Sequence, residues 1–237
     1  MRRIELFIDG TFYLRISNYY KFGHKRAARI DLKGVIGIAE TLGGPDSKVV
    51  RTRIYRGKSA MASEGERLFE NYAMHAGAEQ IFLPCGQTGG QASEKGVDVI
   101  LALDALESAM EGRCESVALV TGDMDFLPLL RRLHRLGKPT ILMGFEANTE
   151  NHYTGTSVAL QREAMQSVLI NNIVDAAEED SDVMGLFPRP RIPEQGQVQG
   201  TPIPVKCGAR EPELSPGTEP EENSEPNEAR ETTCEEN

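Results

Sequence analysis

The chain has 237 residues and a formal charge of −10, and this charge is unevenly distributed. Residues 1–175 carry 21 Lys and Arg against 21 Asp and Glu, whereas residues 176–237 carry 5 against 15 and hold nine of the thirteen prolines. A stretch this acidic and Pro-rich cannot bury a hydrophobic core. We therefore expect a folded domain over residues 1–175 and a disordered tail over residues 176–237, which is open to a protein partner.

The cysteines and the apolar runs narrow the class of protein further. Cys85, Cys114, Cys207 and Cys234 have neither metal-ligand spacing nor the pattern of a disulfide framework. No apolar run approaches the length of a membrane span, and no signal peptide precedes the first strand pattern. These features predict a cytoplasmic protein with reduced thiols and no membrane partner.

Strand and helix patterns alternate along residues 1–175. Strands are predicted over Ile4–Asp9, Val49–Tyr55, Ala78–Leu83, Val117–Val120 and Thr140–Phe145. Helices are predicted over Leu32–Leu42, Glu64–His75, Lys95–Met110, Phe126–Leu136 and Thr156–Val174, and a loop over Pro84–Ser93. This alternation is typical of an α/β domain with a central, mostly parallel sheet of about five strands covered by helices on both faces.

Two basic segments each allow two interpretations. Aromatic and basic residues interleave over Phe12–Arg29, which predicts either a surface that grips a phosphate backbone and stacks bases or an amphipathic helix with a solvated loop. Arg53, Arg56 and Lys58 lie at the end of the second predicted strand. They either hold substrate phosphate or belong to a solvated loop.

Carboxylates follow two of the predicted strands and open one helix. Asp9 ends the first strand, Asp123 and Asp125 follow Val117–Val120 after a glycine, and Asp98 lies in the first turn of a helix. Ligands of an open α/β sheet bind outside the carboxyl ends of its strands, so we expect these carboxylates to converge if the first and fourth strands are neighbours. Clustered carboxylates repel one another unless a cation is present, and Mg²⁺ or Mn²⁺ prefers oxygen ligands.

A metal ion held in this way can orient and deprotonate water and offset charge on a phosphodiester. The pattern therefore predicts metal-dependent phosphodiester hydrolysis. Each carboxylate also has a purely structural interpretation: Asp9 in a turn, Asp123 or Asp125 as a helix cap, and Asp98 as a partner of the helix dipole.

Three further residues near these carboxylates also have open roles. Asp104 lies roughly 240° around an ideal helix from Asp98, so the two do not bind one ion. We expect Asp104 to be a satisfied buried carboxylate or a group that supports the site. Lys95 either binds phosphate or is solvated, and Thr121 either orients a ligand or water or ends the strand.

A covalent phosphatase is excluded by one residue. The sequence Asp9-Gly10-Thr11 resembles a motif of haloacid-dehalogenase-like phosphatases, which need a nucleophilic Asp two residues before the Asp of that motif. Phe7 occupies that position here and cannot attack phosphorus.

Three segments resemble the signatures of the NYN domain family, in its LabA-like branch, within the PIN-like nuclease superfamily. They are Phe7–Gly10, Glu94–Val99 and Val120–Leu129, and the resemblance covers roughly residues 3–171. It implies a PIN-like three-layer α/β/α sandwich, an acidic pocket that binds Mg²⁺ or Mn²⁺, and hydrolysis of RNA. The family's metal positions fall on Asp9, Asp98, Asp123 and Asp125.

The chain departs from the family pattern at two places. Many members have Asn three residues after the first Asp, where this chain has Phe12. Members often have an Asp in the last helix, and near Leu160–Gln166 this chain has only Glu163.

The sequence as a whole predicts a metal-dependent ribonuclease that hydrolyses single-stranded or structured RNA. Asp9, Asp98 and Asp123 would hold one or two ions, and Asp125 would complete the cluster or orient water. The alternative is a catalytically weak or inactive NYN module that regulates by binding RNA or protein. A homodimer across the outer helices is compatible with both.

Overall fold

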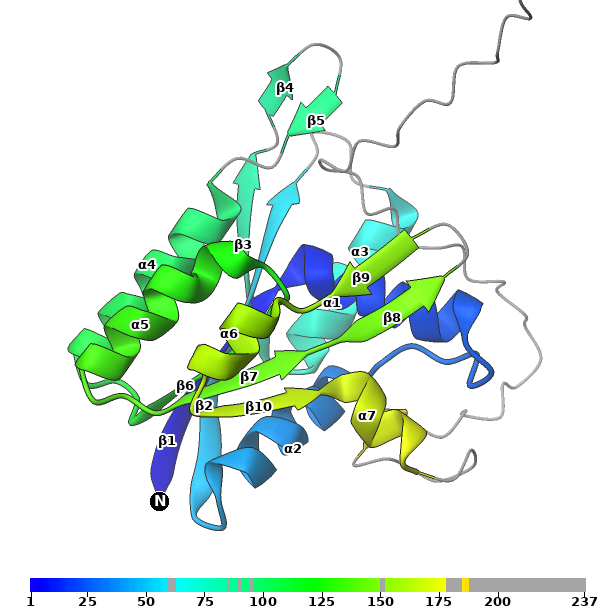
Figure 1. Ribbon diagram of the computed structural model, residues 1–237. Helices are drawn as coiled ribbons and strands as arrows, with labels where there is room; N and C mark the ends of the chain where they lie inside the picture. Colours follow the sequence, from blue (N-terminus) through cyan, green and yellow to red (C-terminus); the bar gives the residue numbers. More distant parts are fainter. Residues whose placement is uncertain are drawn as a thin grey trace, which may run out of the picture.

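The centre of the protein is a parallel sheet with the strand order β10-β7-β6-β1-β2-β3 (Figure 1). The computed structural model describes residues 1–58, 63–84, 86–88, 91–93, 96–149, 152–177 and 185–187. The strands of this sheet are β1 (Arg2–Asp9), β2 (Ser47–Lys58), β3 (Ala78–Pro84), β6 (Ser116–Val120), β7 (Thr140–Gly144) and β10 (Gln166–Leu169). All neighbouring pairs among them run parallel.

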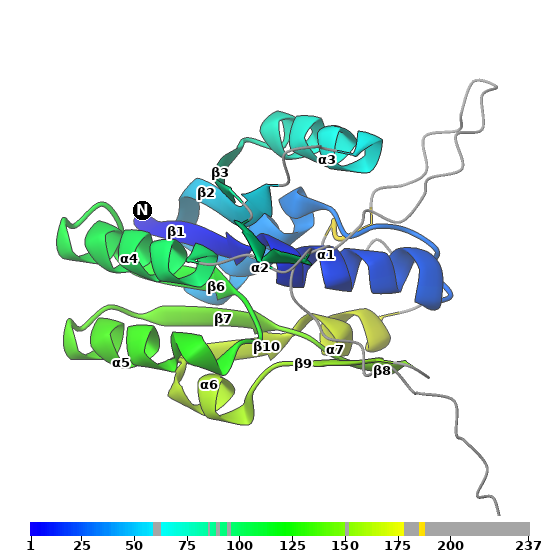
Figure 2. The ribbon, with the colours of Figure 1, turned by 90° about the horizontal axis from the view of Figure 1, so that it is seen from above.

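Alternating side chains divide the core into two layers. On one face, Ile4, Leu6 and Ile8 of β1 pack against α1, α2, α3 and α7. On the other face, Phe7 packs against α4, α5 and α6. The helices are α1 (Gly10–Asn18), α2 (Leu32–Gly43), α3 (Glu64–His75), α4 (Val97–Met110), α5 (Leu127–Arg135), α6 (Val158–Glu163) and α7 (Ile170–Asp175). Figure 2 shows the two helix layers on opposite sides of the sheet, so the predicted three-layer α/β/α sandwich is confirmed.

Local signals explain why several predicted elements have the expected bounds. At the start of α3 the Ser63 side chain accepts from the Glu66 amide, while the Glu66 carboxylate accepts from the Ser63 amide at 2.6 Å, a capping box. Gly77 then ends the helix with a φ of 80°, a conformation that glycine adopts without strain. None of the helices in the described ranges is long and apolar enough to cross a membrane.

The sequence predicted one helix over Thr156–Val174, and this prediction is wrong. This segment forms α6, then the edge strand β10, then α7. The Met165 amide donates to the Thr140 side chain at 3.1 Å, and Gln166 to Leu169 then pair in parallel with β7. Pairing with a distant strand therefore overrides the local helix pattern.

Two short hairpins were also not predicted. The predicted loop Pro84–Ser93 contains β4 (Gly86–Thr88) and β5 (Gln91–Ser93), and a second antiparallel pair is formed by β8 (Glu146–Thr149) and β9 (His152–Gly155). Cys85 lies outside the described residues.

Three residues of the segment that follows the predicted boundary at residue 176, Gly185 to Phe187, contact the core. Leu186 is fully buried and Phe187 is 8% exposed. The Asp31 amide donates to the Leu186 carbonyl at 2.8 Å, and a Cβ on Gly34 would lie 2.5 Å from the Leu186 Cα. The folded unit therefore extends to Gly185–Phe187, a segment too short to show an apolar pattern of its own.

Candidate active site

The sheet reverses its strand order at β1, which lies between β2 and β6. The first and fourth predicted strands are therefore neighbours, with Ile8 beside Val120. A reversal of this kind leaves a crevice at the carboxyl ends of the strands, where ligands of α/β sheets bind. Asp9 is the last residue of β1, and Asp123 follows the end of β6 by three residues. The topology thus brings two of the predicted carboxylates to adjacent strand ends.

Asp9 has a local structural role as well as this position. Its backbone is extended, and its Oδ1 accepts from the Phe12 amide at 3.0 Å, so it caps the amino end of α1. The next residue is a glycine because β2 is so close: a Cβ on Gly10 would lie 2.1 Å from Cγ of Arg56. Packing against β2 therefore requires the glycine, and the start of α1 accounts for the aspartate.

Asp123 also caps a turn. Its Oδ1 accepts from the Asp125 amide at 2.9 Å at the start of the 3₁₀ turn Met124–Phe126, and both carboxylates are exposed. The Asp123 amide donates to Oγ1 of Thr121 at 3.2 Å. Thr121 is 1% exposed, so it shapes this turn from inside the protein. The capping interpretation of Asp123 is confirmed, and it leaves the carboxylate at the surface of the crevice.

Phe12 packs against the turn that carries Asp123, a role that sequence reasoning missed. The ring is 6% exposed, and its Cε2 lies 2.6 Å from the position of a Cβ on Gly122. The Ser157 amide donates to the Gly122 carbonyl at 3.1 Å and holds this turn from the other side. The signal in the sequence was the glycine before Asp123, because no side chain fits against that ring.

Asp98 lies in the exposed first turn of α4, a helix that contacts both β1 and the turn Met124–Phe126. Helix α4 therefore covers the part of the sheet from which Asp9 and Asp123 extend. Within the described ranges, no three His, Cys, Asp or Glu side chains are grouped closely enough to hold a metal ion. The predicted convergence of all four aspartates is thus not found there. Lys95 lies outside the described residues.

Arg53 does not reach the crevice, contrary to the prediction that it binds substrate. It is 4% exposed, its Nη2 donates to Glu5 at 2.8 Å, and its guanidinium lies 5.0 Å from the centre of the Phe7 ring. Its Nη1 is 3.4 Å from Asp104, which also accepts from the Tyr55 hydroxyl at 2.8 Å. Burial and the hydrogen bond to Asp104 raise the pKa of Tyr55.

These residues form a polar network beneath α4. The Asp104 side chain is 30% exposed and paired, so the expectation of a satisfied carboxylate holds, although its burial is only partial. We call Glu5, Arg53, Tyr55 and Asp104 the α4 network below.

Arg56 is also enclosed by the fold. It is 5% exposed, lies 5.2 Å from the centre of the Phe69 ring and is 3.7 Å from Glu66. The prediction that Arg56 holds substrate phosphate is therefore not supported. Lys58, at the last position of β2, keeps a side chain that is 42% exposed, and it pairs with Glu70 at 3.0 Å.

Most aromatic residues of Phe12–Arg29 pack inward, as the amphipathic-helix interpretation expects, whereas Phe22 is 48% exposed and lies 5.6 Å from the Arg29 guanidinium. After α1 the chain makes the π-helical turn Tyr19–Gly23. Tyr20 is fully buried, with ring centres 5.7 Å from Phe145 and 5.2 Å from Phe187. Burial raises the pKa of its hydroxyl. This ring is not available to stack on a base.

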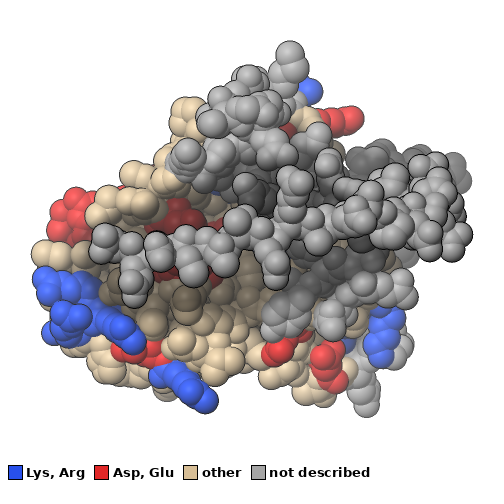
Figure 3. Space-filling model, turned by 45° about the horizontal axis from the view of Figure 1, so that its top comes forward, with Lys and Arg blue, Asp and Glu red and all other residues tan. Residues whose placement is uncertain are grey.

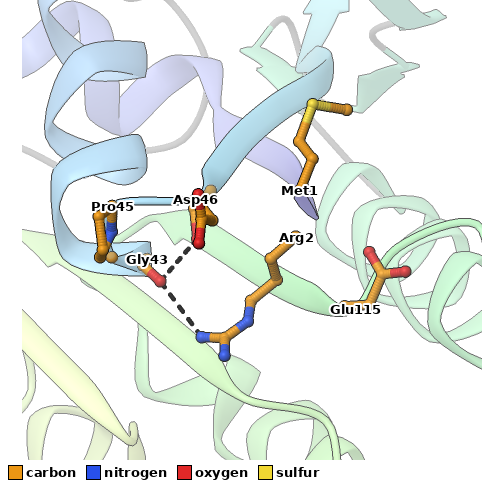
Figure 4. Close-up of a pocket in the computed structure, with 8 residues that line it drawn as sticks. Met1, Arg2, Gly43, Pro45, Asp46 and Glu115 are labelled. Atoms are coloured by element: carbon orange, nitrogen blue, oxygen red, sulfur yellow. Dashed lines mark hydrogen bonds between the residues drawn. The ribbon is translucent and has the colours of Figure 1, made fainter.

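A cavity of about 470 Å³ lies at the amino edge of the sheet, and none of the four predicted site aspartates lines it. Figure 4 shows Arg2 reaching across it to the Gly43 carbonyl, at 3.2 Å. Met1, Asp46 and Glu115 also line it. Because ligands of parallel sheets bind at the carboxyl edge, we assign the candidate site to the crevice between β1 and β6.

The chain belongs to the NYN domain family, whose model matches residues 3–171. The NYN domain has a PIN-like nuclease fold, which agrees with the sheet and with the position of the crevice. Membership of the LabA-like branch stays a prediction.

The chain is similar to one curated protein in sequence and to one solved structure in fold. The uncharacterized protein MJ0482 of Methanocaldococcus jannaschii is 31% identical over 159 residues, which cover 67% of this chain and 51% of that protein. The chain therefore spans about half the length of this curated relative. A crystal structure of VPA0982, a protein of unknown function from Vibrio parahaemolyticus, matches with a TM-score of 0.51 and 23% identity, over 71% of this chain and 93% of that one.

Proposed function

We propose that this protein is a metal-dependent ribonuclease that hydrolyses phosphodiester bonds in the crevice between β1 and β6. The observation that carries the proposal is the position of Asp9 and Asp123, which leave neighbouring parallel strands where the strand order reverses. Membership of a family with a nuclease fold supports phosphodiester chemistry at this position.

The donor chemistry of the crevice fits Mg²⁺ or Mn²⁺, since carboxylate oxygens are the ligands that such ions prefer. Among the described residues no group of three ligands is preassembled. Mg²⁺ keeps several waters and is usually held by one or two carboxylates together with substrate phosphates. Asp9 and Asp123 would hold the ion, and Asp98 and Asp125 would add negative charge nearby. When bound, the metal would activate water and offset the charge that develops on the phosphate.

The chain's own residues position and shield this site. The caps on α1 and on the turn Met124–Phe126 orient the Asp9 and Asp123 carboxylates through backbone amides before any ion arrives. The Phe12 ring excludes water from beneath the crevice. Lys58, exposed at the end of β2, would attract the phosphate backbone of RNA.

The test is cleavage of single-stranded and structured RNA by the full chain with Mn²⁺, Mg²⁺ or EDTA. We expect cleavage that requires the metal and falls at least about 100-fold in Asp123→Asn, because a bound metal supplies several kcal/mol of transition-state stabilisation. Asn caps a helix as well as Asp does, so this variant should keep its fold. Asp46→Asn, an exposed Asp at the opposite edge, is the matched control and should cleave normally.

A second function has one observation in its favour, the lack of three grouped metal ligands among the described residues. In that case the protein is an NYN module that binds RNA or a protein and regulates without cleaving. Tight RNA binding with no cleavage under any metal, unchanged in Asp123→Asn, would support this function and contradict the nuclease.

A further inference from the structure

The stretch that begins with α1 is strongly basic. Gly10–Ile30 contains five Lys and Arg and no Asp or Glu, whereas the rest of residues 1–175 contains 16 Lys and Arg against 21 Asp and Glu. Figure 3 shows basic side chains at the right edge of the visible face, on the side where α1 ends in Figure 1. A positive charge concentrated in this way attracts polyanions such as RNA.

The chain that follows α1 has a fixed and unusual backbone. The π-helical turn Tyr19–Gly23 leads into a tight turn, in which the Ala27 amide donates to the His24 carbonyl at 3.0 Å. Ala27 has a φ of 47°, in the left-handed region that alanine rarely adopts. The Lys21 ammonium donates to the Ala27 carbonyl at 3.2 Å. Because π-helical turns and strained residues are frequent at functional sites, we examined Tyr19–Arg29 as a binding surface and call it the basic arm.

The surface of the basic arm carries an aromatic ring. About half of the Phe22 side chain is exposed, and the Arg29 guanidinium lies beside its ring. Arg29 also donates to Oδ1 of Asn18 at 2.8 Å, which holds the guanidinium in place. Nucleobases stack on aromatic rings and on Arg guanidinium groups. Since the bases of a duplex are already stacked on one another, such a platform favours single strands.

The basic arm lies at the same edge of the sheet as the crevice. The rings of Tyr19 and Tyr20 are centred 5.2 Å and 5.7 Å from the ring of Phe145, which directly follows β7. Strand β7 is the neighbour of β6, whose end leads to Asp123. On the other side, the nine residues of α1 join Asp9 to the arm and span about 14 Å. An RNA strand that leaves the crevice along this edge therefore meets the arm.

We propose that the basic arm is a second binding surface for single-stranded RNA, next to the crevice. Phe22 and Arg29 stack on a base, and Lys25, which is exposed at the tight turn, neutralises a phosphate. The proposal rests on the proposed function for the identity of the polymer, RNA, and does not depend on its cleavage.

The test measures RNA binding by the full chain in EDTA, so that metal-dependent cleavage does not interfere. Fluorescence anisotropy follows a labelled single strand of about 16 nucleotides, which is long enough for one binding surface. We expect Phe22→Ala to raise Kd at least about fivefold, because one stacked base is lost. Phe22→Trp should bind as tightly as the wild type. The matched control is Leu68→Ala on α3, which is 59% exposed and should bind normally.

A second pair of variants tests the phosphate contact. Lys25→Gln should reduce the slope of log K against log salt by about 0.7, the value for one phosphate of a single strand. Arg132→Gln removes an exposed charge from α5, on the other face of the sheet, and should keep the wild-type slope. Thermal unfolding checks that each variant is folded.

The outcomes separate this proposal from the nuclease. Wild-type affinity in Phe22→Ala, an equal change of slope in Lys25→Gln and Arg132→Gln, or an equal loss of duplex binding in Phe22→Ala would each overturn the basic arm as a single-strand surface. Binding through the arm without cleavage under any metal would contradict the nuclease and support the arm. Metal-dependent cleavage with unchanged binding in the arm variants would do the reverse.

Discussion

Two groups of carboxylates, those of the α4 network and those of the crevice, differ in how the fold surrounds them. In the α4 network, Glu5 is 3% exposed and faces the Arg53 guanidinium, and Asp104 accepts from Tyr55. At the crevice, Asp9 and Asp123 are oriented by backbone amides, and Asp123 is exposed. Buried charge needs a counter-charge supplied by the fold. Asp123 at the crevice is instead exposed to water, where a cation from solution can approach.

The largest expected effect is a loss of folding stability when the α4 network loses its buried cation. Arg53→Met should lower the free energy of unfolding by about 3–5 kcal/mol, because it leaves Glu5 buried without a counter-charge. Urea unfolding measures this change. The control is Arg51→Met, which removes an exposed ion pair to Glu79 and should cost no more than about 1 kcal/mol. Equal losses in the two variants would show that burial does not set the cost of removing a counter-charge.

A smaller effect is expected at the other end of the α4 network. Tyr55→Phe removes the hydroxyl that donates to Asp104 at 2.8 Å, while Arg53 remains 3.4 Å from that carboxylate. We expect a loss of about 1 kcal/mol in the free energy of unfolding, the usual net value of one such hydrogen bond. Repeating the change in an Asp104→Ala background should reduce the loss, because only the 3.4 Å hydrogen bond from Arg53 to the hydroxyl then remains. An unchanged loss would mean that the hydroxyl does not act through Asp104.

The smallest expected effect concerns the exposed ion pair between Glu115 and Arg3. The hydrogen bond from Arg3 lowers the pKa of Glu115 to about 2, from an ordinary value of 4.5. A depressed pKa in the folded state adds stability above pH 4.5, and this contribution is lost as the pH falls toward 2. In urea titrations, the free energy of unfolding of Glu115→Gln should therefore fall slightly less steeply between about pH 5 and about pH 3 than that of the wild type. An identical slope in both proteins would contradict this pairing.

The strands and helices that carry their own boundary signals were predicted from the sequence. Helix α3 has the predicted bounds because Ser63, Glu66 and Gly77 mark its ends within a few residues. Strand β10 was missed because its conformation depends on pairing with β7, more than twenty residues earlier. Leu186 and Phe187 were missed for the same reason, since their binding surface is built by α2 and the turn Tyr19–Gly23.

At the candidate site, the sequence by itself determined the residue types, the strand-end positions of Asp9 and Asp123, and the family signatures. These are local features, set by a strand, a glycine and a cap within a few residues. Only the tertiary structure decided which charged groups face the crevice. Arg53 turns inward because Glu5 lies on the neighbouring strand and Asp104 on the helix above it. Whether a side chain is buried or paired depends on residues that are distant in the chain, so a local sequence pattern cannot predict it.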